Sequence, residues 1–325
     1  MGDGFYLGRP VEPVLSEFPG AAVRRAPRWR DWLTSFPFHL LLFLLTVLTT
    51  LIVGSHIALN YRRDLPVFDW DSTLAFFSSL WRHPSLLGAG VPFSVTLLGI
   101  LLAHELGHYI TCRRYGIQAT YPYFIPAPTL IGTLGAFIRI KSPIVTRRAL
   151  FDVGISGPLV GFVVAIPALA LAILHSRAGT PPTSPESITL GNPLSVILLT
   201  KLLRPGIDPS GISLHPIGCA AWVGLFATAL NLLPAGQLDG GHILYAVLGE
   251  KHRAVSRGLF VALVPLGIFC WAGWMVWAVI LLAIGLRHPV LLASDEVLGP
   301  GRKLLALVAF LVLILTFIPT PFAVH

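Results

Sequence analysis

Long runs of apolar residues alternate with shorter polar segments along the chain. A helix of about 20 apolar residues, rising 1.5 Å per residue, crosses a hydrocarbon core of roughly 30 Å. The pattern predicts about six transmembrane helices, at residues 36–59, 91–110, 153–174, 217–233, 259–286 and 304–318. The fifth run is long for one crossing and contains Pro265, so it fits either one tilted helix or two short ones.

Two of the connecting segments are expected to be more than simple loops. Residues 120–140 are apolar and aromatic but are interrupted by prolines and glycines. Irregular backbone cannot face lipid, so this segment is expected to be re-entrant or extended and packed against protein. The stretch 194–203 in the next external segment predicts an interfacial helix. The predicted fold class is therefore an all-α polytopic membrane protein with a β-like segment around 120–140.

The composition agrees with a membrane protein. Hydrophobic residues make up 54% of the 325 residues and charged residues only 12%, whereas soluble domains carry about a quarter charged residues. This excludes an ordinary soluble enzyme and a disordered regulator. It also excludes a nucleic-acid binder of the basic-stripe kind, despite the net charge of +8. The three cysteines lie far apart, which predicts neither a disulfide framework nor a CxxC metal site.

Lysines and arginines cluster in residues 1–35, in 113–148 and in 236–257, which are alternate connections between the predicted spans. The positive-inside rule then predicts a cytoplasmic N-terminus, with the second and fourth spans ending on the cytoplasmic side. The bias fades after the fifth span and leaves the side of the C-terminus open. We expect residues 1–35 to form a mature basic arm touching anionic lipid, and residues 36–325 to form one transmembrane domain.

Three acidic residues stand within or beside apolar spans: Glu105, Asp152 and Asp239. An ionisable group at membrane depth costs about 2.5–3.5 kcal/mol on insertion scales, which favours a functional interpretation. Glu105 belongs to the HExxH pattern at residues 104–108. On a helix, His104 and His108 share one face and can bind one metal ion, and Glu105 can act as general base. Zinc suits these ligands best, although the spacing also fits iron or cobalt.

A catalytic zinc ion usually takes a third protein ligand. The candidates are Asp239, Asp152, His242, His215 and Cys112. Asp152 begins the third span, where an acid stabilises a helix N-terminus, and Cys112 is expected to be a buried apolar residue. Asp239 follows the fourth span, after Pro234 and among glycines that permit a tight turn, at the cytoplasmic depth expected for the two histidines. Spacing therefore favours Asp239.

HELGH at 104–108, followed by NLLPAGQLDGG at 231–241, resembles the paired motifs of the site-2 protease family of intramembrane metalloproteases. GTLGAFIRIKSP at 132–143, GISGPLVGF at 154–162 and LTFIPTPF at 315–322 are similar to the branch with bacterial and plastid members. The resemblance covers about residues 90–320. The segments between the motifs leave no room for a PDZ insertion, in contrast to many members.

The resemblance implies one zinc ion per chain, held by His104, His108 and Asp239, with Glu105 as general base and acid. It implies that Asn231 steadies the substrate or the developing oxyanion. The expected reaction is hydrolysis of peptide bonds in or near transmembrane segments, with a single-span membrane protein as substrate and the lipid bilayer as the surroundings. The expected location is a bacterial inner membrane. Alternatives are a prenyl-protein endopeptidase, a pseudoprotease, and a transporter or assembly factor using the cluster as a metal or proton relay.

Overall fold

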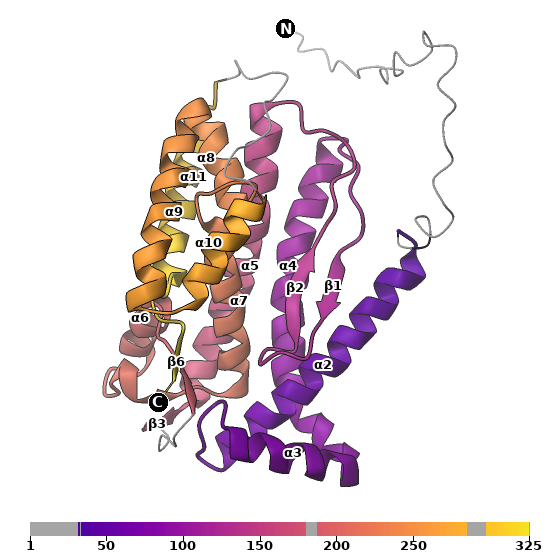
Figure 1. Ribbon diagram of the computed structural model, residues 1–325, viewed down its shortest axis with the longest axis vertical. Coiled ribbons are helices and arrows are strands. Elements are labelled where there is room, and N and C mark those ends of the chain that lie inside the picture. Colours follow the sequence, from indigo (N-terminus) through magenta and orange to yellow (C-terminus); the bar gives the residue numbers. More distant parts are fainter. Residues whose placement is uncertain (1–31, 33, 180–186, 285–296, 325) are drawn as a thin grey trace, which may run out of the picture.

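The computed structural model describes residues 32, 34–179, 187–284 and 297–324, and within them it is mostly helical (Figure 1). The long helices follow the apolar runs: α2 Phe36–Arg62, α4 Val91–Arg114, α5 Arg147–His175, α7 Pro216–Leu232 and α11 Pro300–Thr316. Within the described residues, four helical stretches are long and apolar enough to cross a membrane: Phe36–Arg62, Pro84–Arg114, Arg147–His175 and Asp239–Phe269. The prediction of a polytopic, mostly helical membrane protein is confirmed.

The centre of the molecule is formed by α4, α5 and α7, which stand side by side (Figure 1). Trp222, Leu225 and Cys219 of α7 are buried against Leu97 of α4 and Leu169 of α5. Almost every residue of α7 is buried, so α7 needs no polar face and reads as a continuous apolar run. These three packed helices therefore hold the segments that join them in fixed positions.

An antiparallel hairpin lies between α2 and α4 (Figure 1). Its strands are β1 Tyr123–Pro126 and β2 Thr133–Phe137, paired as Tyr123 with Phe137 and Pro126 with Thr133. The Thr49 hydroxyl of α2 donates a 2.6 Å hydrogen bond to the Gly132 carbonyl and so fixes the tip of the hairpin. The β-like segment predicted around 120–140 is therefore confirmed, with β1 and β2 paired to each other along one edge of each strand.

The region after α7 differs from the sequence-based expectation. Residues 236–257 were expected to form a loop, but they contain α8 Asp239–Leu248, the 3-10 turn η3 Gly249–Lys251 and the start of α9 His252–Phe269. Pro265 lies inside α9, and the helix ends four residues later. A second helix, α10 Gly273–Ile284, then packs beside α9. The fifth apolar run thus forms two helices, and the turn between them at Cys270–Ala272 is the break.

Short elements complete the ends. Two of them, α3 Trp70–Arg82 and the 3-10 helix η1 Pro84–Gly90, were not predicted, whereas α6 Leu194–Leu203 is the helix predicted at 194–203. The others are the 3-10 helix η2 Pro209–Gly211 and the strands β3 Arg177–Ala178, β4 Ile188–Leu190, β5 Ile212–Ser213 and β6 Phe322–Val324. Strand β6 pairs with β4, which places the C-terminal strand at the end of the molecule opposite the start of α2 (Figure 1). Most of the basic arm predicted at 1–35 lies outside the described residues.

Candidate metal centre

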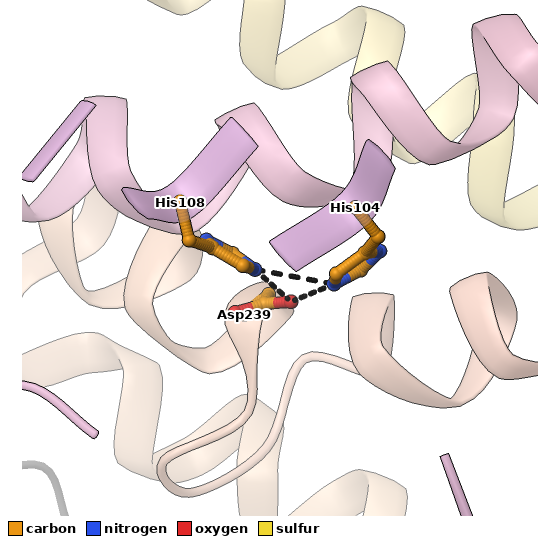
Figure 2. Close-up of side chains that lie close together, drawn as sticks. All are labelled: His104, His108 and Asp239. Atoms are coloured by element: carbon orange, nitrogen blue, oxygen red, sulfur yellow. Dashed lines mark hydrogen bonds and ion pairs between the residues drawn. The ribbon is translucent and has the colours of Figure 1, made fainter. Parts of the chain in front are cut away.

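Two histidines of α4 point toward one another from successive turns. His104 and His108 are both buried, and their Nε2 atoms are 3.1 Å apart. The i, i+4 spacing of a helix produces this pairing, because it places both side chains on one face. Figure 2 shows both rings turned toward the carboxylate of Asp239.

Asp239 reaches the histidines from a different part of the chain. Helix α7 ends at Leu232, and a short turn leads into α8, whose first residue is Asp239. Gly236 in this turn has φ +54°, a conformation that favours glycine. Asp239 Oδ2 lies 3.4 Å from His104 Nε2 and 3.3 Å from His108 Nε2.

The donor set fits a zinc ion. Four ligands at about 2.05 Å in a tetrahedron have neighbouring ligand atoms about 3.3 Å apart. The three distances between the two Nε2 atoms and the carboxylate oxygen are 3.1, 3.3 and 3.4 Å. Two imidazoles and one carboxylate also leave one tetrahedral position open, as catalytic zinc sites require. Within the described residues, His104, His108 and Asp239 are the group of potential metal ligands that lie together.

Hydrogen bonds beside the cluster orient the ligands. His108 Nδ1 lies 2.7 Å from the Val153 carbonyl of α5. A carbonyl only accepts, so Nδ1 carries a proton, and in the neutral imidazole this leaves the lone pair of Nε2 free to bind a metal ion. Asn231, in the last turn of α7, holds its side-chain nitrogen 3.3 Å from His104 Nε2. The asparagine singled out by the motif therefore lies beside the ligands.

Two glycines of α5 make the space for the histidine rings, a feature that sequence reasoning missed. A Cβ on Gly157 would lie 2.1 Å from His108 Nε2, and a Cβ on Gly161 would lie 3.2 Å from His104 Nδ1. Helix α5 can approach the metal ligands this closely only where it has no side chain. Both glycines occur in GISGPLVGF, so the family resemblance marked the segment without revealing its role.

Glu105 is buried beside the cluster, and its carboxylate accepts a hydrogen bond from the backbone of Ile138, directly after β2. It lines a cavity of about 150 Å³ together with Asn231, Trp277 of α10 and the β2 residues Leu134 to Ala136. A general base here would face an enclosed space bounded by a strand.

The other sequence-predicted ligand candidates lie elsewhere. Cys112 is buried among apolar side chains, and His215 caps the opposite end of α7. His242 lies on α8, with its Cβ against the backbone of Gly154 in α5. Asp152 makes its contacts at the end of α4, with Tyr115 and Arg302.

Asp152, Tyr115 and Arg302 form a cluster that links two helices. The carboxylate accepts two hydrogen bonds from Arg302 of α11, at 2.8 and 2.7 Å, and a third from the Tyr115 hydroxyl at 2.6 Å. Burial and the Asp152 carboxylate raise the pKa of Tyr115, so the phenol stays a neutral donor. The bidentate pair joins α5 to α11, so the role of Asp152 is structural, as expected. The expected position at a helix N-terminus was wrong, because α5 begins at Arg147 and has no acidic residue in its first turn.

Comparison with known proteins places these motifs in context. The family model of peptidase family M50 matches residues 92–270, which is more than half of the chain. The protein named probable zinc metalloprotease EGY2, chloroplastic, of Arabidopsis thaliana is 30% identical over 276 residues, covering 81% of this chain and 47% of the relative. The Arabidopsis protein named probable zinc metalloprotease EGY1, chloroplastic, is 32% identical over 240 residues, covering 71% and 43%. The chain thus spans about half the length of the curated relatives it matches.

Proposed function

The chain belongs to peptidase family M50, the site-2 protease family, and on this basis we propose that it is a membrane-embedded zinc metalloprotease that cleaves membrane-protein substrates. The observation that carries the proposal is the triangle of His104, His108 and Asp239, whose edges match a tetrahedral zinc site. Glu105 stands next to this triangle and lines the adjoining cavity. The domain responsible is residues 36–325.

Each side chain has a distinct task in this proposal. His104, His108 and Asp239 hold one zinc ion, which supplies the Lewis acidity that polarises a peptide carbonyl and acidifies water. Glu105 accepts the proton of the attacking water and later delivers it to the leaving amine. Asn231, 3.3 Å from His104, directs its amide toward the carbonyl that receives the attack.

The substrate is proposed to be a single-span membrane protein that enters as an extended strand. A helical substrate hides its carbonyls in its own hydrogen bonds, so the scissile segment must unwind. Strand β2 belongs to a two-stranded sheet and pairs on one side with β1. Its residues Leu134 to Ala136 also line the cavity that contains Glu105. Addition of the substrate to the other edge of β2 would satisfy the unwound backbone and place it against Glu105.

The membrane is a separate part of the proposal. The sequence predicts a bacterial inner membrane, whereas the matched relatives are named chloroplastic, which points to a plastid membrane. In both membranes we propose that the end where α4 finishes and α5 begins faces the cytoplasm or stroma. Fractionation of cells producing the full chain, followed by protease digestion of sealed vesicles, tests both the compartment and the orientation.

Cleavage of a tagged single-span substrate tests the hydrolase function. The substrate is co-expressed with the wild type, with Glu105→Gln, and with Glu250→Gln as a matched control. Glu250 is paired with Arg253 on the surface and has an exposed side chain. We expect cleavage by the wild type and the control, and none by Glu105→Gln. Equal cleavage by all three would refute the hydrolase function.

Elemental analysis of the purified protein tests the metal centre without relying on activity. The wild type and Glu105→Gln should each hold one zinc ion per chain, whereas Asp239→Ala should hold little. Stoichiometric zinc in Asp239→Ala would refute its role as a ligand. Zinc bound by an inactive wild type, together with ion flux that a hydroxamate chelator does not affect, would favour the transporter alternative.

A further inference from the structure

A groove of about 400 Å³ lies between α8 and α11, separate from the cavity beside Glu105. Its floor contains Leu232, Pro234 and Gly240, from the end of α7 and the start of α8. Its walls are hydrocarbon side chains of α8 and α11: Ile243, Leu244, Val247, Leu248, Leu307 and Phe310. Nothing in the proposed hydrolysis uses this groove.

Among the residues that the structure describes, Lys303 is the one charged residue that lines the groove. Its neighbour Arg302 is held by Asp152 in a bidentate pair. Lys303, in contrast, is exposed and makes no ion pair with any residue that the structure describes. An apolar groove with a single unpaired cation at its rim has the charge and polarity of a site for an anionic amphiphile.

The length of the groove matches one leaflet of a bilayer. Along α11 it extends from Lys303 to Leu313, ten residues, or about 15 Å at 1.5 Å per residue. This is half of a hydrocarbon core of roughly 30 Å. Lys303 stands in the first turn of α11, at the same end as the basic starts of α5 and α9 (Figure 1). The groove therefore has about the length of one leaflet, with Lys303 at the end where these basic helix starts lie.

We propose that this groove binds one acyl chain of an anionic phospholipid, whose phosphate pairs with Lys303. Its floor residue Gly240 follows Asp239 directly, so the bound chain packs against the back of the turn that carries this proposed ligand. The lipid then supports the α7–α8 turn, whose residues Leu232, Pro234 and Gly240 line the groove. The proposal rests on the groove and its charge, and does not depend on the hydrolase function.

Native mass spectrometry of the full chain, purified in detergent, tests the headgroup part. The probes are phosphatidylglycerol and phosphatidylcholine with identical acyl chains. One lysine near an anionic headgroup gives about a five-fold preference. We expect the wild type to bind one phosphatidylglycerol with about this preference, and Lys303→Gln to lose it. Lys141→Gln, an exposed lysine outside the groove, should keep it. An unchanged preference in Lys303→Gln would overturn the proposal.

Filling the groove tests the acyl-chain part. Leu307 lines the groove and Leu311 does not, although both are leucines of α11 with exposed fractions of 66% and 54%. Leu307→Trp should reduce the binding of both lipids at least ten-fold, and Leu311→Trp should leave it unchanged. Equal lipid binding by the two variants would overturn the proposal. So would a disulfide-linked dimer formed through Leu307→Cys, because a second copy would then occupy the groove.

Discussion

Gly157→Ala is expected to destroy the metal centre while leaving the fold intact. The added Cβ would lie 2.1 Å from His108 Nε2, whereas ordinary contacts begin at about 3.4 Å. The ring or the helix must therefore move by about 1.3 Å, the difference between the two distances. The ring cannot swing freely, because its Nδ1 is held by the carbonyl of Val153, which lies on α5 one turn before Gly157.

The size of the effect follows from the tolerance of metal sites. Ligand distances in such sites are kept within about 0.2 Å, so a displacement above 1 Å removes His108 from the ligand set. Removing a group that merely orients a ligand already costs about 10–100-fold in affinity. We therefore expect the zinc affinity of Gly157→Ala to fall at least about 100-fold, because a direct ligand is displaced.

Competition with a chromogenic chelator measures this affinity in a graded series. Gly161→Ala places its Cβ 3.2 Å from His104 Nδ1 and should weaken zinc binding mildly, since a shift of a few tenths of an ångström suffices. Gly99→Ala, on α4 with no atom within 4 Å of the added Cβ, should behave as the wild type. Thermal unfolding of the metal-free proteins separates loss of zinc from loss of fold. Wild-type zinc affinity in Gly157→Ala would refute the argument.

Further predictions concern three other contacts. Asp152→Asn weakens the pair with Arg302, whose members are 25% and 29% exposed, so thermal unfolding should show a loss of about 1 kcal/mol; an unchanged melting temperature would contradict the link between α5 and α11. Thr133→Val loses the 2.8 Å hydrogen bond to the Ile125 carbonyl and should cost about 1 kcal/mol in the same assay. Trp277→Ala enlarges the cavity beside Glu105, so the cleavage rate of a substrate with phenylalanine near the scissile bond should rise relative to that of a substrate with alanine there. An unchanged ratio of the two rates would contradict a role of Trp277 in substrate selection.

Local patterns predicted much of the fold. Apolar runs predicted α2, α4, α5, α7 and α11, because helices that cross a membrane are apolar over most of their length. The HExxH spacing placed His104 and His108 on one face, which needs only the geometry of a helix. Helix α8 was missed because its ten residues are short and its first residues, Asp239 and two glycines, favour a turn. Its helical conformation is stabilised by packing against α5.

Contacts between distant segments were beyond the reach of these patterns. Asp152 was expected to favour a helix N-terminus, but Arg302, its main partner, lies 150 residues away. Gly157 and Gly161 matter because of the two rings opposite them, and no local pattern says which side chain faces a glycine. The same holds for the Val153 carbonyl, which orients His108. Tertiary packing decides these features, and it is not encoded at a fixed spacing.

The three acidic residues near the spans are compensated in three ways, and this difference agrees with the roles proposed for them. Asp152 accepts hydrogen bonds from the Arg302 guanidinium and the Tyr115 phenol, which stabilise its charged form. Asp239 has two imidazole nitrogens, which leave its charge to be shared with a metal ion. Glu105 makes no ion pair with a lysine or arginine among the described residues, and its hydrogen bond comes from the backbone of Ile138. Burial disfavours the charged form of a carboxylate that has no fixed cation, so such a group can hold a proton where a paired carboxylate cannot. This environment supports the proposed role of Glu105 as general base and acid, whereas Asp152 and Asp239 each have fixed partners.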